Sequence, residues 1–584
     1  MRVSQLLATT RKELSNTYGI KSQDLLVQAG YIRPLAAGIF SSMHFAHRTF
    51  QKIEHILREE MNRIGGVEVS MPVVHPADLW RKTGRYDDID ESLIRFEDRA
   101  GRDLVLAMTH EEVVASLAFS DLKTYRQFPK LIYQIQTKFR DEARSRGGLI
   151  RVREFVMKDS YSLDTSWEGL QKQYDAHYEA YHRIYQRAGL PVISIQSDVG
   201  MMGGKVAHEY MYLTEMGEDT IFICAQTGYK ANKEIASMKK PVPGEERLLP
   251  LEKVHTPGTK TIEDVAAFLG VVASRCGKVV FFSGFVKGKE KVIMAIVRGD
   301  MEVNQNKLQN LVKSKYLEPA TEKQIESIGS VPGYASPMDI DRSQVVLVTD
   351  DLAAASPNLV LGANEVDYHQ KNVCYGREYT ADFVGDIVNA YEGALAPDAK
   401  TDRDVLTSFR GVEVGNIFQL GTKYTDALEA QFMDENGRRQ SIIMGSYGIG
   451  VGRLLGCLAE EYHDENGLML PIQVAPYEVM IVALLDHDEV GVAAEKLYQD
   501  MQATGIEVLF DDRNKKVARA GEKFADADLI GIPIRITVSS RSLKNGGFEV
   551  KRRNASEGEL CTSDETIEKV TNIINNLKVD SLSK

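Results

Sequence analysis

The stretch KFRDEARSRGGLIRVREF, residues 138–155, carries five arginines and three carboxylates in a chain of 584 residues whose formal net charge is −12. Side chains alternate between the two faces of a strand, so a period of two predicts two strands joined at residues 145–148. Arg140 and Glu142 would then share one face. On an arbitrary hairpin such a face is solvated and holds cross-strand ion pairs. Arginine forks beside an aromatic ring can also clamp a nucleotide. The hairpin alone leaves both interpretations open.

Composition indicates an ordinary globular protein, with 43% hydrophobic and 26% charged residues. Its length predicts three or four domains. Five cysteines lie far apart with no C-x-x-C pair, which disfavours a structural zinc site or a disulfide framework and fits a reducing compartment. No apolar run is long enough for a signal peptide or a membrane span. We therefore expect a cytoplasmic protein with no membrane partner.

Helical spacing and strand-like runs organise the first part of the chain. Residues 44–66 have apolar side chains at helical spacing before a Gly-Gly pair, and residues 67–74 and 103–108 are typical of strands. Thr109 with Glu112 fits an S/T-x-x-E capping box, which predicts that a helix starts there.

A shift in composition indicates an insertion. Residues 239–260 are rich in Pro, Gly and charge, and strand-like and helical runs alternate from there to a second linker-like stretch at residues 394–404. The pattern of the first 220 or so residues resumes near Gly411, so this α/β module is predicted to be inserted into a host domain. After Pro471 alternating strands and helices predict a further domain with an open sheet.

Three motifs in order carry a resemblance to the class II aminoacyl-tRNA synthetases. FRDE followed by RVREF within residues 138–155 has the form of motif 2. The helix and strand of residues 44–74, with Pro72, resemble motif 1, which implies a homodimer. GSYGIGVGR, residues 445–453, resembles motif 3.

The resemblance is closer to the bacterial-type prolyl-tRNA synthetases and covers nearly the whole chain. It rests on AMTHEEV, KFRDEARSRGGLIRVREFVMKDSYS, GVEVGNIFQLGTKYT, GSYGIGVGR and ARAGEKFADADLIGIPIRITV. It implies a multidomain α+β and α/β protein with an antiparallel-sheet catalytic core, an inserted α/β editing domain and a C-terminal α/β anticodon-binding domain. The expected ranges are 1–223 and 408–470 for the catalytic domain, 224–407 for the editing domain and 471–584 for the anticodon-binding domain.

The family activates L-proline with ATP and transfers it to tRNA(Pro). By resemblance, Arg140 binds the α-phosphate and the prolyl carboxylate, while Arg151 and Arg453 hold the β- and γ-phosphates. Fixed cations suit this reaction because negative charge grows on the α-phosphate. The other expected nucleotide contacts are Phe155, stacked with Arg453 on the adenine, Glu142 on its amino group, and Gln419. Mg²⁺ is expected at the phosphates, with Glu413 either a ligand or a strand-surface carboxylate. No zinc is expected.

Proline is a compact ring with a secondary ammonium that carries two N–H donors. Thr109 and Glu111 could accept both, although Thr109 could also serve only as an N-cap. Ser446 occupies the position where the family places a small residue against the ring. We therefore expect Thr109, Glu111, Arg140 and Ser446 to form the proline site.

The insertion resembles a domain that hydrolyses alanine wrongly attached to tRNA(Pro). A pocket sized for proline cannot sterically exclude alanine, and missing methylenes give limited discrimination. Each expected residue has a plain structural alternative, such as a strand lysine, a turn or a satisfied histidine. The expected editing residues are Lys278, Gly333, Pro337, Asp350 and His369.

The C-terminal stretch DDRNKKVARAGEKF has a local excess of positive charge that suits a phosphate backbone. Asp512, Arg513 and Arg519 are the expected anticodon contacts, and a solvated charge run is the alternative. Alternative functions for the whole chain are a synthetase for threonine or serine, an inactive tRNA-binding paralogue and a free-standing deacylase. Arg140, Phe155 and Arg453 are all present, which disfavours the inactive paralogue. Cys457, after the motif 3 arginine, is expected only to pack.

Overall fold

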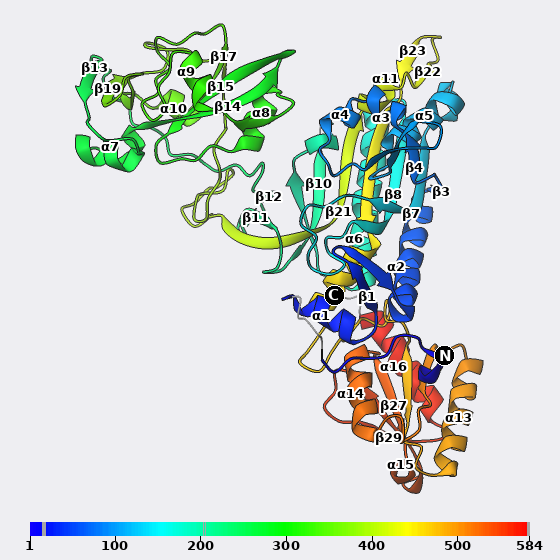
Figure 1. Ribbon diagram of the computed structural model, residues 1–584. Helices are drawn as coiled ribbons and strands as arrows, with labels where there is room; N and C mark the ends of the chain where they lie inside the picture. The colour runs from blue at the N-terminus through cyan, green and yellow to red at the C-terminus, as the bar shows by residue number, and fades with distance from the viewer. Residues whose placement is uncertain (14–18, 203, 205, 581–584) are drawn as a thin grey trace. The chain divides into compact units, whose positions relative to one another are not determined.

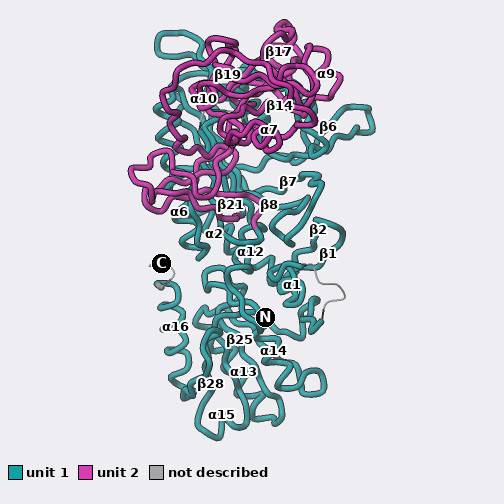
Figure 2. The backbone as a smooth tube through the Cα atoms, turned by 90° about the vertical axis from the view of Figure 1, so that its left-hand side faces the viewer, with its two compact units in different colours: residues 1–194, 199–216, 412–584 teal, residues 195–198, 217–411 magenta. Residues whose placement is uncertain are grey.

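The computed structural model describes residues 1–13, 19–202, 204 and 206–580, which form two compact units (Figure 2). Unit 1 comprises residues 1–194, 199–216 and 412–584. Unit 2 comprises residues 195–198 and 217–411. The insertion that the sequence predicts at 224–407 falls within unit 2. No described helix is long and apolar enough to cross a membrane.

A largely antiparallel sheet forms the centre of unit 1. β7 and β8 pair from Lys130↔Leu163 to Phe139↔Glu154, and β24 continues the sheet from β8. β21 follows β24, β10 also pairs with β21, and β3 adds in parallel to β7. The strands are β3 (Val67–Glu68), β7 (Lys130–Phe139), β8 (Glu154–Asp164), β10 (Ala207–Leu213), β21 (Thr407–Gly421) and β24 (Ile443–Gly450).

Three helices pack beside this sheet (Figure 1). α6 lies against β8 and β24, α12 contacts the same two strands, and α2 packs on both helices. Their apolar stripes drive this packing, as the fully buried Ile53, Ile184 and Leu454 show. The bounds are α2 (His44–Arg63), α6 (Trp167–Ala188) and α12 (Val451–Glu461). The helix predicted over residues 44–66 is confirmed.

The remaining elements of the host domain lie around both ends of the sheet (Figure 1). Its helices are α1 (Lys21–Gln28), α3 (Ala77–Lys82), α4 (Arg85–Asp88), α5 (Glu111–Asp121) and α11 (Lys423–Ala427). Its smaller strands are β1 (Ile32–Ala36), β2 (Ile39–Ser42), β4 (Val74–Pro76), β5 (Arg95–Glu97), β6 (Asp103–Leu106), β22 (Gln431–Met433) and β23 (Arg439–Ser441). The strand predicted over 103–108 is confirmed, whereas residues 67–74 divide between β3 and β4 with Pro72 in the gap.

The hairpin predicted in residues 138–155 is wrong in its extent. β7 ends at Phe139 and β8 begins at Glu154, so the arginine-rich residues lie in a loop. Gly147 and Gly148, within the connection predicted at residues 145–148, have φ of 70° and 60°. The strands end early because the backbone N–H groups of Asp141 and Arg153 donate to the Ser92 and Gly38 carbonyls instead of across a hairpin. The arginines therefore do not alternate between two faces of one sheet.

The capping box predicted at Thr109 is also wrong. α5 begins at Glu111 after His110, and no side chain caps it. The Tyr161 hydroxyl instead accepts a hydrogen bond from the His110 backbone N–H at 3.1 Å. The helix itself is present, with His110 rather than Thr109 at its N-cap position.

The C-terminal segment of unit 1 holds a five-stranded sheet of order β26-β25-β27-β28-β29, parallel in its first three strands. Its elements are β25 (Val479–Ala483), α13 (Asp488–Ala503), β26 (Val508–Asp511), α14 (Ala520–Ile530), β27 (Ile534–Val538), α15 (Ser540–Lys544), β28 (Gly547–Arg552), β29 (Glu559–Thr562) and α16 (Thr566–Asp580). The sequence predicts residues 471–584 as a separate domain. The segment has its own core, but Leu509, Ala527 and Ile530 share the host core, so it is not a separate compact unit.

The first residues of the chain lie along this C-terminal segment. Arg2 forms a parallel bridge with Phe510 of β26. The Ser4 backbone N–H and hydroxyl both donate to the Asp512 carboxylate, at 3.0 and 2.6 Å. The Thr10 hydroxyl donates to Asp526 at 2.6 Å. The two ends of the sequence are thus joined within one unit.

Unit 2 is built on a five-stranded sheet of order β16-β14-β15-β17-β20, beside a three-stranded sheet β13-β19-β18. Its core is apolar, and Ile293, Ala295 and Val297 are fully buried. The strands are β11 (Asp219–Ile223), β12 (Lys230–Asn232), β13 (Glu252–His255), β14 (Gly277–Val286), β15 (Lys289–Arg298), β16 (Leu317–Pro319), β17 (Val345–Asp350), β18 (Leu359–Gly362), β19 (Tyr368–Val373) and β20 (Phe383–Gly385). The helices are α7 (Ile262–Leu269), α8 (Gln305–Val312), α9 (Glu322–Ser327) and α10 (Asp351–Ala355).

Candidate active site

Arg140 follows directly after β7 and lies beside the aromatic ring of Phe155, the second residue of β8. The guanidinium carbon is 5.4 Å from the ring centroid, and Nη2 donates to the Met108 carbonyl at 3.4 Å. The Nε atom is buried and has no hydrogen-bond partner among the described residues. Burial and the neighbouring Arg453 guanidinium lower the pKa of Arg140. A buried cationic donor without an acceptor is a ready contact for an anion.

Arg453 and Glu413 meet at the start of α12. Arg453 Nε donates to the Ile150 carbonyl at 2.8 Å, and Nη1 donates to the Glu413 carbonyl at 2.7 Å. The Glu413 carboxylate is 3.7 Å from Nη1 and accepts from Asn416 at 2.6 Å. Arg453 is therefore held by the loop that follows β7, although it comes 303 residues after Ile150 in the chain.

Arg151 and Glu142 form an ion pair with 2.7 Å between Nη2 and Oε2. Both side chains are partly exposed, so this pair is worth little for stability. Exchange of one partner for a ligand is correspondingly inexpensive. The loop thus brings together Arg140, Glu142, Arg151 and Phe155 with Arg453.

Gln419 is not brought to this group. The register pairs Phe418 with Ser446, and Gln419 with Gly445, so the Gln419 side chain points to the opposite face of the sheet from Ser446. There its amide donates to Gln171 of α6 at 2.8 Å. The structure does not place Gln419 with the arginines as the sequence predicts.

Glu111 is a fully buried carboxylate at the start of α5. The Thr109 hydroxyl donates to Oε2 at 2.5 Å, and the Ser446 hydroxyl donates to Oε1 at 2.8 Å. Thr109 and Ser446 are themselves more than nine-tenths buried. Three of the four residues expected at the proline site therefore form one cluster.

A second network of buried hydrogen bonds, centred on Asp159, lies beside this cluster. Asp159 of β8 accepts from the Lys138 ammonium at 2.7 Å, the Gln134 amide at 2.9 Å and the Tyr161 hydroxyl at 2.8 Å. Tyr161 accepts in turn from the His110 backbone. The network holds the N-terminus of α5, and hence Glu111, relative to the sheet. Burial and the neighbouring Lys138 lower the pKa of His110 to about 3.

Arg85 is a buried cation that sequence reasoning missed. Its Nη1 lies 3.0 and 3.2 Å from the two Glu112 oxygens and 3.4 Å from Glu111 Oε2. Although burial opposes it, the Glu112 carboxylate raises the pKa of Arg85, and burial raises the pKa of Glu112. The only sequence signal was the second glutamate of THEE, which needs a partner once the capping box is excluded.

Glu413 does not belong to a preformed metal site of three or more protein ligands among the described residues. No group of three His, Cys, Asp or Glu that could hold a metal occurs within the described ranges. Mg²⁺ usually takes one or two protein carboxylates and completes its shell with water and substrate phosphates. Glu413, partly exposed beside Arg453, fits that pattern.

Unit 2 encloses a cavity of about 460 Å³. Lys278, Gly333 and His369 line it, so three of the expected editing residues come together. The Lys278 ammonium pairs with Glu302, which also lines the cavity, at 2.6 Å. His369 Nδ1 lies 2.6 Å from the Thr256 hydroxyl, and burial lowers the pKa of His369.

Pro337 and Asp350 are not among the residues that line this cavity. Asp350 is fully buried, accepts from the backbone N–H of Leu352 and Ile387 at 3.0 Å each, and pairs with Lys240 at 2.8 Å. It therefore caps α10, which accounts for it structurally. The expectation that Asp350 belongs to the editing site is not supported by its position.

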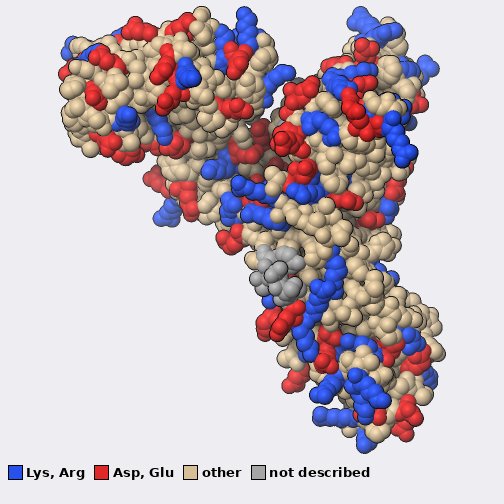
Figure 3. All heavy atoms as spheres, in the orientation of Figure 1, with Lys and Arg blue, Asp and Glu red and all other residues tan. Residues whose placement is uncertain are grey.

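The expected anticodon contacts lie at the C-terminal end of β26 and the start of α14. Arg513 is half-buried and pairs with Asp511 at 2.7 Å and Asp526 at 2.9 Å. Asp512 accepts from Ser4, whereas Arg519 is exposed. Figure 3 shows further lysines and arginines gathered at the far end of this segment, where α15 lies. Arg519 is thus the most available of the three for a nucleic acid.

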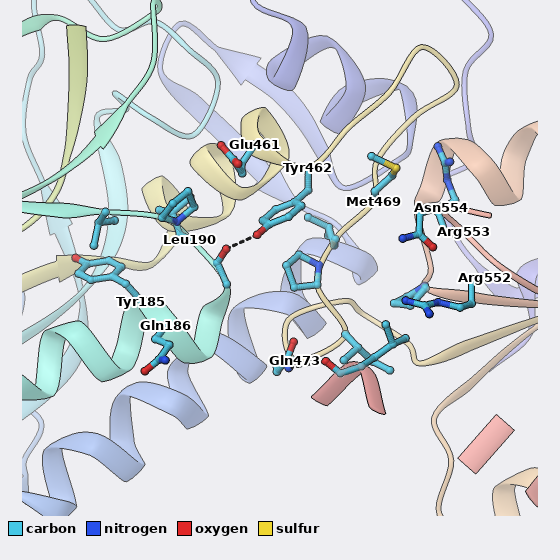
Figure 4. Close-up of a pocket in the computed structure, with 18 of the residues that line it drawn as sticks. Tyr185, Gln186, Leu190, Glu461, Tyr462, Met469, Gln473, Arg552, Arg553 and Asn554 are labelled. Carbon is cyan, nitrogen blue, oxygen red and sulfur yellow. Dashed lines mark hydrogen bonds between the residues drawn. The ribbon is translucent and has the colours of Figure 1, made fainter. Parts of the chain in front are cut away.

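A cavity of about 860 Å³ lies between the end of α6 and the C-terminal segment (Figure 4). Leu190, Tyr462 and Arg552 are among its lining residues, and the Tyr462 hydroxyl donates to the Gly189 carbonyl at 2.5 Å. None of the site residues predicted from the sequence lines this cavity. This cavity is therefore not part of any site predicted from the sequence.

Two family models match the chain. One, described as the tRNA synthetase class II core domain (G, H, P, S and T), matches residues 94–462, and the other, an anticodon binding domain, matches residues 478–573. A proline–tRNA ligase of Salinispora tropica is 47% identical over 99% of this chain and 97% of its own. That of Bacillus subtilis is 44% identical over 97% and 99%.

The chain belongs to the proline–tRNA ligase family.

The fold predicted for a prolyl-tRNA synthetase, a class II core with an anticodon-binding domain, is confirmed. A solved structure agrees: a prolyl-tRNA synthetase from Cryptosporidium parvum, complexed with halofuginone and AMPPNP, superposes with a TM-score of 0.57. It is 12% identical to this chain and covers 96% of it and 78% of its own length, so it speaks for the fold alone.

Proposed function

We propose that the chain is an ATP-dependent proline–tRNA ligase, which activates L-proline to prolyl-adenylate and transfers it to the 3′ end of tRNA(Pro). One observation carries the proposal: the buried Glu111 carboxylate lies between the Thr109 and Ser446 hydroxyls at 2.5 and 2.8 Å. Such a buried carboxylate suits a small cationic amine. The names of the relatives support the same assignment.

The first step joins the proline carboxylate to the α-phosphorus of ATP. A carboxylate oxygen attacks, the bond from the α-phosphorus to the bridging oxygen breaks, and pyrophosphate leaves with the electron pair. The buried Nε of Arg140, which lacks an acceptor among the described residues, is placed to hold the charge that grows on the α-phosphate. Mg²⁺ held by Glu413 would add positive charge at the phosphates. No side-chain nucleophile is needed.

In the second step, a hydroxyl of the terminal tRNA ribose attacks the prolyl carbonyl. The carbonyl–phosphate bond breaks, AMP leaves, and the hydroxyl proton passes to base or solvent. Arg453 and Arg151 hold the nucleotide in both steps under this proposal, and Phe155 supports the adenine. The anticodon arm would be bound by the C-terminal segment, where Arg519 is exposed.

Unit 2 is proposed to hydrolyse alanine from mischarged tRNA(Pro). Water attacks the ester carbonyl, the bond to the ribose oxygen breaks, and alanine and tRNA are released. Support comes from the cavity of about 460 Å³, which has Lys278 and His369 in its wall. His369 would orient the aminoacyl group, and Lys278 would contact the tRNA end.

Two finer assignments complete the proposal. A homodimer is supported by the motif 1 elements, since β3 is an edge strand whose Val67 is 62% exposed. A cytoplasmic location is supported by the cysteines, all five of which are buried and unpaired.

The decisive experiment is exchange of labelled pyrophosphate into ATP, run with each of the twenty amino acids and without tRNA. Strong exchange with proline and weak exchange with alanine are expected. Exchange with none of them, from folded protein, would overturn the proposal. Release of alanine from Ala-tRNA(Pro) by the same protein tests unit 2 separately.

A further inference from the structure

Three ionised groups share one buried site beneath the amine pocket. Arg85 of α4 is 4% exposed, and Glu111 and Glu112 of α5 are fully buried. Together they carry one positive and two negative charges. A site with one net negative charge can accept a substrate ammonium and become neutral, whereas a neutral site would become positive.

Arg85 is shared unequally between the two carboxylates. It reaches both Glu112 oxygens, at 3.0 and 3.2 Å, but only one Glu111 oxygen, at 3.4 Å. The Thr83 hydroxyl also donates to Glu112 Oε1, at 3.1 Å. Glu111 instead receives two hydroxyl donors, Thr109 and Ser446, which carry no charge.

The position of Arg85 is set by aromatic rings as well as by charge. Its guanidinium carbon lies 4.9 Å from the Trp80 ring and 5.5 Å from the Tyr424 ring. These contacts stabilise the cation in its buried place and keep it near both carboxylates. With Glu112 absent, the nearest remaining buried carboxylate for Arg85 is Glu111.

Other charged groups near the three are unchanged in the variants compared below. Lys138 and Asp159 are a buried pair of opposite charge, with 2.7 Å between their atoms. Lys423 interacts with Arg85 and with both glutamates, and burial lowers its pKa; Asp88, of opposite sign, interacts with Lys423. Arg140 also interacts with Glu111.

We propose that Glu112 is a positioning residue for substrate specificity: it holds the charge of Arg85, so that Glu111 keeps its negative charge for the amine of the substrate. The inference rests on the proposed activation of proline. Glu112 acts through Arg85, and the pocket recognises a cationic amine because two carboxylates, not one, are buried against a single arginine.

The test compares Glu112→Gln, Arg85→Met and the double variant in the full-length protein. Glu112→Gln leaves Arg85 to pair with Glu111, so we expect the KM for proline in pyrophosphate exchange to rise about tenfold or more, the effect of one nearby charge. The KM for ATP should not change. The double variant again leaves one net negative charge, so its KM for proline should return toward the original value.

An oxygen analogue of proline gives a second readout. Tetrahydrofuran-2-carboxylate has the same ring and carboxylate but no ammonium, so its inhibition constant should change little in Glu112→Gln. The preference for proline over this analogue should therefore fall by the same factor as the rise in KM. Asp87→Asn, which removes an exposed carboxylate from the same helix as Arg85, is the matched control and should change neither value.

The outcomes separate the two proposals. If the unmodified protein shows no exchange with proline, the proposed function fails. If it exchanges proline but Glu112→Gln keeps its KM, or if the double variant is worse than Glu112→Gln, charge holding is wrong and Glu112 is only structural. Thermal unfolding of each variant checks that the fold is retained.

Discussion

The Ser446 hydroxyl donates a hydrogen bond to Glu111 Oε1 at 2.8 Å across 335 residues of sequence. Ser446 lies in β24 and Glu111 begins α5, so the bond ties the central sheet to the helix that presents the carboxylate. Insertion of unit 2 between them in the sequence does not disturb this contact, because both belong to unit 1. Because the Glu111 carboxylate and the Ser446 hydroxyl belong to different elements, mutation can alter the charge and the hydrogen-bond donor separately.

Glu111→Gln should impair proline activation severely. The variant keeps the shape of the side chain but removes the charge that pairs with the substrate ammonium, and loss of one partner of a buried charged pair costs about 2–5 kcal/mol. We expect kcat/KM for proline to fall by about two to three orders of magnitude. Ser446→Ala, which removes one neutral donor, should cost about 0.5–1.5 kcal/mol. An equal loss for the two variants would contradict the assignment of Glu111 as the charge partner.

Arg140→Lys should reduce the rate of adenylate formation although the positive charge is kept. A lysine cannot present the planar fork of donors, and it would not place a donor where the buried Nε lies. We expect kcat in pyrophosphate exchange to fall by about 10²–10³. The matched control is Arg153→Lys in the same loop, whose guanidinium pairs with Asp141 at 3.1 Å. Similar losses in both variants would show a general effect on the loop.

Acid should destabilise unit 1 through histidines that are buried without charge. Burial lowers the pKa of His177 to about 3 from the ordinary 6.5, and His177 stacks on Tyr447 with 3.5 Å between ring centroids. The unfolded chain binds this proton more readily, so the stability conferred by the neutral ring is complete above pH 6.5 and is lost as pH falls from 6.5 toward 3. The loss approaches about 1.4 kcal/mol per pH unit for each such histidine.

The check is the thermal unfolding midpoint of the unmodified protein and of His177→Gln, measured from about pH 7 to about pH 4.5. These histidines titrate in the unfolded chain within that window. The pKa of His110 is also lowered in the folded protein, so the unfolding midpoint of both proteins should decrease as the pH decreases. The variant should start lower and fall less steeply. Parallel curves would show that His177 carries a proton in the folded state.

Arg519→Ala should weaken tRNA binding and leave proline activation unchanged. The side chain is exposed and belongs to the basic run with Lys515 and Lys516. Removal of one phosphate contact should reduce the salt dependence of binding by about one unit of slope. Arg513→Ala should instead destabilise the C-terminal segment, because it breaks pairs with Asp511 and Asp526. Filter binding across a salt series, together with thermal unfolding, distinguishes the two effects.

Residues that are contiguous in a motif could be predicted from the sequence. Arg140, Phe155 and Arg453 come together as expected, because the loop after β7 and the start of α12 each carry their own pattern. The conformation of that loop was mispredicted, because the backbone of Asp141 and Arg153 is hydrogen-bonded to Ser92 and Gly38, which are distant in the sequence. Fold class was predicted from the resemblance of these motifs to a family, whereas the periods of the strands and helices indicated only the types of elements.

Residues that act through distant contacts could not be predicted. Arg85 lies in GRYDD, a plain helical turn, and only the fold places it against Glu112. Gln419 has a strand pattern that fixes its spacing but not which face meets the nucleotide. Asp350 lies in a motif that resembles the family's editing site, yet its carboxylate already accepts from two backbone N–H groups and pairs with Lys240.

The contacts of Arg2 and Ser4 with Phe510 and Asp512 impose an order on folding during translation. A ribosome makes the first residues of this chain long before their partners exist, and domains generally fold as they emerge. The first segment must therefore wait, unpaired, until the C-terminal segment has left the ribosome. Assembly of unit 1 finishes where translation of the chain began.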